Sequence, residues 1–335
     1  MPPALPHATR RTWLGWAAGL VVLPAGAGAL RSEQRTLFGS PVELLLAADA
    51  PRAASQEVMA GLCTMNARWN AWKPGDIDDL NAALRAGRPH VTTPALIEMI
   101  RSATVLERQS SGHFNPAIGG LVAAWGFHDD VMRPGKRPQP GTLQRWTERR
   151  PSLASLDIRG LTVRGRGRGV QLDFGAYAKG IALDWALDRL ALSGVRDGLL
   201  NLGGNLAAMG AAGERPWRVG IRHPHRPGLA ASLTLRGQEA VVTSGTYERW
   251  RLLDGQRCTH IIDPASGQPA NGLDSVTVVH RCAAHADAAA TALLVAGPAR
   301  WQAVAQRMGA DEVLVIDRSG RQVATPWLAA RLQPG

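Results

Sequence analysis

Two spacings of hydrophobic residues recur along the chain, one helical and one that alternates from residue to residue. Helical spacing predicts helices over residues 51–72, 76–84, 94–106, 176–192, 284–296 and 298–308. Alternation and short apolar runs predict strands at 42–46, 170–174, 199–202, 217–221, 232–235, 240–243, 275–281 and 312–316. Because both kinds of element are interleaved without an internal repeat or a linker-like segment, we predict one large α+β domain with mixed sheets flanked by helices.

Three segments outside these elements have distinctive compositions. Glycine and aromatic residues are mixed over 110–128, which predicts a loop shaped around a ligand. Residues 129–151 are rich in proline and arginine, and we expect a surface loop with one short helix. The Arg-Gly pairs at 164–169 have the composition of an RNA-binding segment, but one copy between two β-like runs favours a basic hairpin turn.

The N-terminus carries an arginine pair, Arg10 and Arg11, just before an apolar segment that runs from Trp13 to Leu30. That segment ends in alternating Ala and Gly at 25–29, the small-residue pattern that a signal peptidase requires. We therefore predict an export signal over residues 1–30, with the twin-arginine route favoured, and a periplasmic protein that begins near Leu30. The alternative is an uncleaved signal that anchors the protein, since about 18 apolar residues just span a bilayer.

Composition changes this picture only slightly. The 335 residues include 38 Lys and Arg against 27 Asp and Glu, a formal charge of +11, which raises the question of a nucleic-acid or anionic-membrane partner. Arginine is scattered without a basic block, so no nucleic-acid partner is predicted. Cys63, Cys258 and Cys282 are too widely spaced for a disulfide framework or a cysteine zinc site, and Cys282 is interpreted as a small buried hydrophobe.

The segment from Asp173 to Gly180 aims the N-terminus of a helix beyond the end of a strand. Free backbone amides and the helix dipole make such an end attractive to anions. Lys179, one of only three lysines, lies in the first turn of this helix, where it could reach a phosphate. An ordinary strand–helix connection explains the segment equally well on these residues alone.

Two other patterns are compatible with chemistry. Asp287 and Thr291 are four residues apart on one helix, so they share a face and offer the hard oxygen donors that suit Mg²⁺. Taken alone, they are more simply a helix-start residue and a packed residue. His260 ends a strand beside a polar turn, where it could act as a general base near neutral pH, although a structural histidine is the commoner case. The polar segment at 243–247 fits either a ligand loop or a plain turn.

Six segments together resemble the ApbE family of flavin transferases, in the family's order and across nearly all of the chain after residue 30. They are Phe38-Gly39-Ser40; residues 66–81 around Trp72; Ser111-Gly112-His113-Phe114-Asn115; residues 172–180; Thr243-Ser244-Gly245; and residues 260–264 with 286–291. Members of that family bind FAD and Mg²⁺, cleave the flavin's pyrophosphate and transfer FMN to a Thr or Ser hydroxyl of a target protein. The resemblance implies the family's α+β catalytic fold over residues 31–335, with FAD in a cleft between subregions.

Carried over by position, the resemblance implies roles for individual residues. Asp287, Thr291 and the carbonyl of Ala176 would hold Mg²⁺, and His260 would deprotonate the acceptor hydroxyl, with Asp263 beside it. The remaining cofactor-binding residues implied are Phe38, Trp72, His113, Phe114, Asn115, Asp173, Lys179, Thr243, Ser244, Gly245 and Ile262. Asn115 and Asn205 stand where the family usually has Asp, which preserves size but removes a charge.

The implied partners are FAD and an acceptor flavoprotein subunit of a membrane respiratory or electron-transfer system, with transient proximity to the membrane surface. Two other activities stay open. One is a pyrophosphatase that cleaves FAD to FMN and AMP without transfer. The other is a periplasmic maturation protein that binds FAD without turnover.

Overall fold

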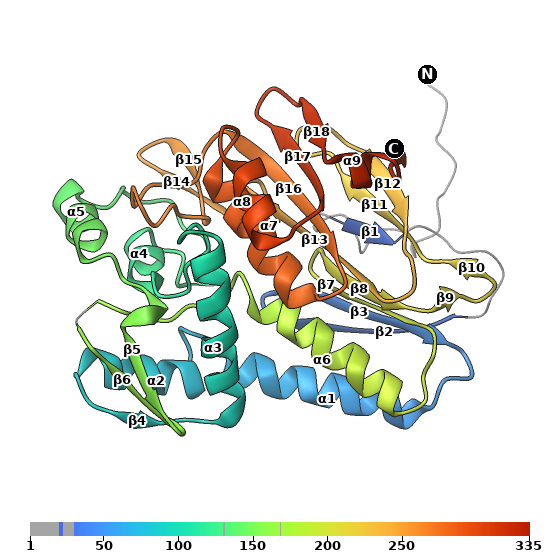
Figure 1. The fold of residues 1–335 in the computed structure, drawn as a ribbon, viewed down its shortest axis with the longest axis horizontal. Helices are drawn as coiled ribbons and strands as arrows, with labels where there is room; N and C mark the ends of the chain where they lie inside the picture. Colours follow the sequence, from blue (N-terminus) through green and yellow to red (C-terminus); the bar gives the residue numbers. More distant parts are fainter. Residues whose placement is uncertain (1–19, 23–29, 130, 168) are drawn as a thin grey trace, which may run out of the picture.

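The architecture is built around one eight-stranded antiparallel sheet (Figure 1), in a computed structural model that describes residues 20–22, 30–129, 131–167 and 169–335. Its strand order is β18-β17-β16-β13-β8-β7-β3-β2. In chain order the strands are β2 Leu30–Leu37, β3 Ser40–Ala47, β7 Gly198–Leu202, β8 Asn205–Met209, β13 Glu239–Gly245, β16 Leu273–His280, β17 Glu312–Asp317 and β18 Gln322–Ala324. The α+β class is confirmed, and so are the strands predicted at 42–46, 199–202, 240–243, 275–281 and 312–316.

Helices cover one face of this sheet and a smaller sheet covers the other. The helices are α1 Arg52–Arg68, α6 Ala178–Leu192, α7 Ala283–Ala296 and α8 Trp301–Met308, and the smaller sheet has the order β1-β11-β12-β19. Its strands are β1 Leu20–Val22, β11 Arg218–Arg222, β12 Leu229–Thr234 and β19 Gln333–Pro334. Alternate residues of one strand serve the two cores: Leu200 of β7 packs with α1 and α6, and Leu199 packs toward β11 and β12.

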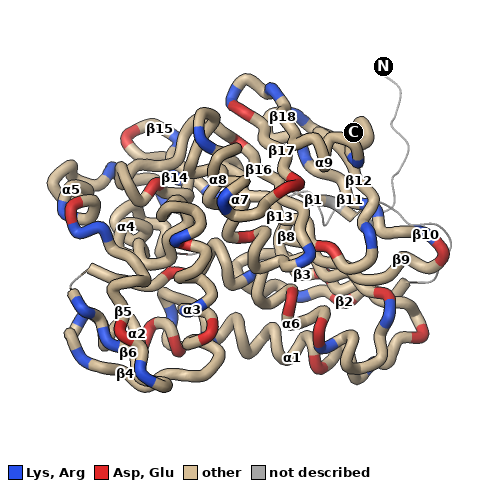
Figure 2. Tube along the Cα trace, in the orientation of Figure 1, with Lys and Arg blue, Asp and Glu red and all other residues tan. Residues whose placement is uncertain are grey.

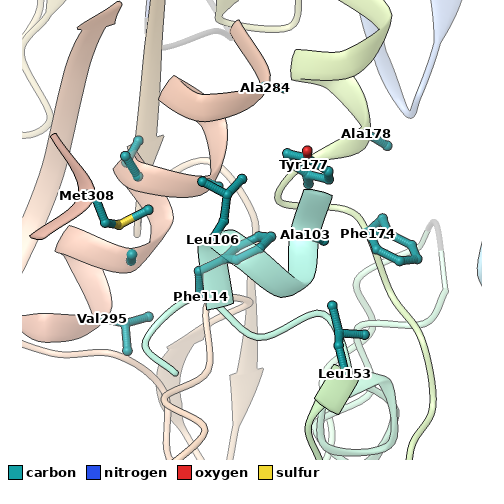
Figure 3. Close-up of a cluster of buried hydrophobic side chains, with 14 of the residues drawn as sticks. Ala103, Leu106, Phe114, Leu153, Phe174, Tyr177, Ala178, Ala284, Val295 and Met308 are labelled. Atoms are coloured by element: carbon teal, nitrogen blue, oxygen red, sulfur yellow. The ribbon is translucent and has the colours of Figure 1, made fainter. Parts of the chain in front are cut away.

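A third region lies beside α7 (Figure 1, lower left) and contains α2 Asp76–Arg85, α3 Pro94–Gln109 and the sheet β4-β6-β5. Its strands are β4 His90–Val91, β5 Leu156–Arg159 and β6 Thr162–Gly165, with the short helix η2 Leu153–Ser155 before β5. Thr93 caps α3 by accepting from the amide of Leu96, and Pro94 occupies the first turn, as predicted. In Figure 3, Leu106 of α3 meets Tyr177 and Ala284, so this region shares a continuous core with α6 and α7.

The remaining elements are short. They are α4 Gly119–Ala124, α5 Pro140–Arg149, the hairpin β14 Trp250–Leu253 and β15 Gln256–Thr259, the pair β9 Ala211–Ala212 and β10 Arg215–Pro216, and α9 Pro326–Ala329. The single helix expected in 129–151 is α5, whereas the loop expected over 110–128 also contains α4.

Two predicted elements were wrong. The hairpin turn of the β5–β6 pair is at Gly160 and Leu161, while Arg164 lies within β6, so the Arg-Gly segment follows the hairpin instead of forming its turn. Residues 170–174 alternate in burial as predicted but form no ladder strand, only one parallel bridge between Gln171 and Ile118. The amide and carbonyl of Leu172 bond instead to the buried side chain of Asn81, at 2.7 and 2.9 Å, which replaces a strand partner.

The predicted export signal falls mostly on residues 1–19 and 23–29, which lie outside the described residues. Its described part is Leu20–Val22, which pairs antiparallel with β11. Among the residues that the structure describes, no helix is long and apolar enough to cross a membrane. Lys and Arg are interspersed with Asp and Glu along the described part of the chain (Figure 2), and several Lys and Arg lie close together near β4, β5 and β6.

Candidate functional site

The site is built where the first turns of α6 and α7 cross, and each helix caps the other. Asp184 of α6 accepts from the amides of Ala283 (2.7 Å) and Ala284 (2.9 Å) at the start of α7. In return, Asp287 Oδ2 of α7 accepts from the amide of Gly180 at 3.0 Å. A Cβ on Gly180 would stand 2.5 Å from the carbonyl oxygen of Ala283, so only glycine permits this approach. The reciprocal caps fix the Asp287 carboxylate against the N-terminus of α6.

Asp287 is not a helix-start residue. The N-cap of α7 is Cys282, whose sulfur lies 3.4 Å from the amide of His285 and donates to Asp184 Oδ2 at 3.1 Å. The prediction that Cys282 is merely a buried hydrophobe is therefore wrong, because its thiol makes polar contacts at a helix end. Asp287 lies one turn further along and is only 3% exposed.

The environment of Asp287 is electrostatically demanding. Burial raises the pKa of its carboxyl above the ordinary value of 3.8, while the Lys179 ammonium, the Gly180 amide and Asn205 act in the opposite direction. Asn205 opens β8, is 1% exposed, and has its Nδ2 buried without a hydrogen-bond partner among the described residues. Its side chain lowers the pKa of Asp287, so the amide group lies beside this buried carboxylate. Sequence reasoning noted Asn205 only as a departure from the family.

Thr291 lies one further turn along α7 and faces the last residues of β13. Its Oγ1 is 3.1 Å from Ser244 Oγ, which brings the polar segment at 243–245 to the site. Thr243 points to the opposite face of the sheet, where its Oγ1 bonds to Thr277 Oγ1 at 2.8 Å. The Thr243 side chain therefore faces away from Thr291, because successive residues of a strand face opposite sides, and the cofactor contact implied for Thr243 stays a prediction. A Cβ on Gly245 would lie 2.5 Å from the ring of Tyr247, so this strand end is closely packed.

The turn before α6 presents a second acid. Asp173 Oδ1 accepts from the amide of Gly175 at 2.8 Å, and burial raises the pKa of its carboxyl. Arg249 and a side-chain hydrogen bond from Trp72 lower that pKa in part, so Trp72 lies at this turn, and its cofactor contact stays a prediction. The amide of Gly180 bonds to Asp287, so it does not make the usual helical bond to the carbonyl four residues earlier, that of Ala176.

His260 follows β15 and is held by the backbone of Arg249. Its Nδ1 lies 3.0 Å from the carbonyl oxygen of Arg249, and its own amide donates to the same oxygen at 3.2 Å. A carbonyl only accepts, so Nδ1 carries the proton and Nε2 keeps a free lone pair. Burial, with the positive charges of Arg249 and Lys179, lowers the pKa of His260 to about 4. The imidazole is therefore neutral at pH 7, which is the protonation state that a general base requires, and the catalytic role of His260 stays a prediction.

Several predicted residues organise the surroundings instead of lining the site. Phe114 is 2% exposed and packs edge-on against Tyr177, with ring centroids 5.7 Å apart (Figure 3), so its ring belongs to the core beside the site and its cofactor contact stays a prediction. Asn115 donates to the carbonyl of Pro151 and accepts from the amide of Ala117, both at 2.8 Å, so its amide group orders the loop. His113 Nδ1 is likewise 2.7 Å from the carbonyl of Ser110.

Three further predicted residues have local contacts. Asp263 accepts from the amide of Ala265 at 3.0 Å and from Ser266 Oγ at 2.7 Å, so its carboxylate shapes the turn after His260. Ile262 is 4% exposed and belongs to the apolar cluster behind that turn. Phe38 has a positive φ of 52° in the β2–β3 turn, and its amide donates to the Asn66 side chain at 2.6 Å. Their roles in catalysis or cofactor binding stay predictions.

The donor set fits a hard cation. Among the described residues, no three His, Cys, Asp or Glu side chains gather as a metal centre. The set that the resemblance implies is of a different kind: the carboxylate of Asp287, the hydroxyl of Thr291 and the carbonyl of Ala176 would offer one charge and three oxygens, which would match the few protein ligands that Mg²⁺ keeps. A buried carboxylate with a raised pKa also gains from a nearby cation.

Comparisons with known proteins identify the family. A sequence model of the ApbE family matches residues 38–315. The chain belongs to the ApbE family. It is 41% identical over 340 residues to the FAD:protein FMN transferase of Rhodobacter capsulatus. That alignment covers 98% of this chain and 64% of the relative's length. It is 35% identical to the FAD:protein FMN transferase of Klebsiella pneumoniae, over 88% of this chain and 92% of that protein.

Solved structures of the family share the fold. The apo form of the Pseudomonas stutzeri flavinyl transferase ApbE is 27% identical, with a TM-score of 0.79 over 93% of this chain and 100% of that one. The ApbE protein of Thermotoga maritima is 22% identical, with a TM-score of 0.83 over 90% and 99% of the two chains. The predicted flavin-transferase fold is therefore confirmed.

Proposed function

We propose that this protein is an FAD:protein FMN transferase that uses Mg²⁺ and modifies a Thr or Ser hydroxyl of an acceptor protein. The observation that carries the proposal is the convergence of Lys179, His260 and Asp287, from three separate segments, in a chain that belongs to the ApbE family. The Lys179 ammonium lowers the pKa of both His260 and Asp287, so it lies within electrostatic reach of both groups.

The reaction forms one bond and breaks one. The acceptor hydroxyl oxygen attacks the phosphorus on the FMN side of the FAD pyrophosphate, the bond to the bridging oxygen breaks, and AMP leaves. The hydroxyl proton passes to Nε2 of His260. The products are an FMN phosphoester on the acceptor and AMP. Such transfer depends on alignment and charge neutralisation more than on a covalent enzyme group.

The chain's own residues supply these requirements. The N-terminus of α6 and the Lys179 ammonium attract the pyrophosphate, and the Nδ2 donor of Asn205 offers a hydrogen bond to an anionic oxygen. Asp287, Thr291 and the Ala176 carbonyl would hold Mg²⁺, which when bound would neutralise charge on the pyrophosphate oxygens.

His260 is arranged to receive the acceptor's proton. The Arg249 carbonyl fixes its Nδ1 as a donor, so Nε2 is unprotonated. Its pKa of about 4 makes the imidazole a weak base in the protein alone. The negative pyrophosphate beside it would raise that pKa toward the working pH, because an opposite charge favours the imidazolium.

The cellular setting is part of the same proposal. Export by the twin-arginine route would place the enzyme in the periplasm, where it would meet acceptor flavoprotein subunits of membrane electron-transfer systems. The positive balance of the chain supports attraction to a pyrophosphate and to a membrane-bound partner, without a nucleic acid.

One experiment separates this function from its alternatives. The protein is incubated with FAD, Mg²⁺ and a flavin-free acceptor subunit that carries a Thr in an Asp-Ser/Thr-Gly-Ala-Thr-like sequence. We expect covalent fluorescent flavin on the acceptor, the FMN mass increment on one Thr, and an equal amount of AMP. AMP without modified acceptor indicates a pyrophosphatase, and bound flavin with neither product indicates a binding protein.

A further inference from the structure

The hairpin β14–β15 has two different faces. Trp250 is opposite Thr259 and Leu252 is opposite Arg257, so these four side chains share one face of the hairpin, the outward face, on which Trp250, Leu252 and Arg257 are exposed and Thr259 is buried. Trp250 is 40% and Leu252 42% exposed. The inward face contains Leu253, which is fully buried. Trp250 and Leu252 are thus two large apolar side chains, partly exposed to solvent and two residues apart on one strand.

The hairpin does not need these outward side chains for its anchorage. Its inward Arg251 donates to the carbonyls of Trp125 (2.8 Å) and Arg133 (2.9 Å), and Leu253 and Cys258 belong to the apolar cluster beneath. The hairpin is therefore fixed from below. Trp250 and Leu252 are therefore not needed to anchor the hairpin, and exposed apolar side chains of this kind are typical of a recognition surface.

The outward face is also preorganised. The Arg257 guanidinium lies 4.4 Å from the centre of the Trp250 ring and donates to the carbonyl of Tyr247 at 3.1 Å. The cation–π contact holds the indole in place, so little side-chain freedom remains to be lost when a partner binds. Tryptophan and arginine are the residue types most enriched at energetically dominant positions of protein interfaces.

The charge of this face favours an acidic partner. None of its four outward side chains is acidic, and Arg257 is exposed. The nearest hairpin carboxylate, Asp254 in the turn, accepts from the amide of Arg137 at 3.0 Å. Arg257 therefore presents a positive charge beside the apolar surface of Trp250 and Leu252.

The face is continuous with the proposed base. Thr259 directly precedes His260, and Arg249, whose carbonyl holds the His260 ring, directly precedes Trp250. Both strands of the hairpin thus lead into the residue that must reach the acceptor hydroxyl. The outward face is therefore joined directly to the two strand ends that hold His260.

We propose that the outward face of β14–β15 docks the acceptor protein, through an apolar side chain placed against Trp250 and Leu252 and a carboxylate paired with Arg257. The proposal rests on the proposed transferase function and specifies how the protein substrate is selected. It predicts that the hairpin determines affinity for the acceptor and leaves the chemistry on FAD unchanged.

The test uses the full-length enzyme with Trp250→Ala, Leu252→Asp and Arg257→Glu, and two controls. Trp327→Ala and Leu192→Asp alter exposed apolar side chains (73% and 78% exposed) on other elements. Two quantities are measured: binding of the purified flavin-free acceptor subunit by fluorescence anisotropy, and AMP release from FAD without acceptor. Each hairpin variant should weaken acceptor binding and lower kcat/KM for transfer at least about tenfold, mainly through KM. The controls should match the wild type, and AMP release without acceptor should be unchanged in all variants.

A charge-swap arm identifies the partner's carboxylate. Changing acidic residues near the modified Thr of the acceptor to Lys, one at a time, should restore binding to Arg257→Glu for one of them. Hairpin variants that bind the acceptor with wild-type affinity overturn the docking assignment, even when transfer is intact. Variants that lose acceptor-independent AMP release also overturn it, because the damage then lies at the FAD site. Absence of transfer by the wild type, with normal acceptor binding, contradicts the transferase function instead.

Discussion

Replacing Asp287 by asparagine separates the cost of burying a carboxylate from its use in the reaction. The raised pKa means that burial outweighs the combined help of Lys179, Gly180 and Asn205. At neutral pH the ionised carboxyl is therefore less favourable in the folded protein than in the unfolded chain. Asn keeps an acceptor oxygen for the Gly180 amide and removes the charge. We expect the metal-free Asp287→Asn protein to be at least as stable as the wild type at pH 7.

The pH dependence gives the sign of the stability difference between the wild type and Asp287→Asn, and an upper bound on its size. Below the ordinary pKa of 3.8 both states carry a protonated carboxyl, so Asp287 costs nothing there. As the pH rises from 3.8 to the raised folded value, the unfolded chain releases its proton first, and wild-type stability falls by at most about 1.4 kcal/mol per pH unit relative to Asp287→Asn. Above that value the difference is constant.

Bound Mg²⁺ should make the wild type more stable than the Asp287→Asn protein. A ligand at 100 times its Kd stabilises the wild type by about 2.7 kcal/mol, and the variant should gain little. FMN transfer should fall at least about 100-fold in the variant, as expected for a lost metal ligand. The assays are thermal unfolding from pH 3.5 to 8 with EDTA or Mg²⁺, and in-gel flavin fluorescence of the acceptor. Asp188→Asn, at an exposed position on α6, is the control. Full activity with unchanged Mg²⁺ dependence refutes the metal assignment, and marked destabilisation in EDTA at pH 7 refutes the burial argument.

Three further substitutions test other parts of the site and fold. His260→Gln should reduce transfer about 10²- to 10⁴-fold while FAD still binds. It should also remove the rise in wild-type stability between about pH 4 and 6.5, where the unfolded histidine binds a proton that the folded one does not. Unchanged transfer would exclude the role of His260 as the base. Thr291→Val should weaken Mg²⁺ dependence and Thr291→Ser should retain it, as measured by metal titration of AMP release; equal behaviour of the two would contradict a hydroxyl ligand. The Arg331 side chain is 4% exposed and pairs with Glu239 (2.7 Å) and Glu312. Arg331→Met should lower the unfolding free energy by about 3–5 kcal/mol and leave transfer by the folded fraction intact. A loss below about 1 kcal/mol in denaturant titration would show that the two carboxylates tolerate the absence of Arg331.

Two strands, β8 and β2, were not predicted, each for a different physical reason. β8 is buried at every position, so it has no polar alternation to reveal it. β2 is an edge strand with mostly polar side chains, which resembles a loop in sequence. Residues 170–174 have the opposite problem: their alternation is real, but Asn81 from α2 takes the place of a neighbouring strand. The hydrophobic periodicity of a segment indicates which of its sides is buried, but it does not indicate which group forms hydrogen bonds with its backbone.

Within the site, the sequence by itself determined the spacings that are local. The four-residue interval between Asp287 and Thr291 places both on one face of α7, and the glycine at 180 allows a close helix approach, because helix geometry alone sets such relations. Only the tertiary structure decided which groups meet. The register of β13 sends Ser244 toward α7 and Thr243 away, and the pairing of α6 with α7 makes Asp287 a cap for the other helix. Burial beside two cations, which no local pattern encodes, sets the protonation of His260. These outcomes depend on contacts between residues far apart in the chain, and packing, not sequence spacing, selects them.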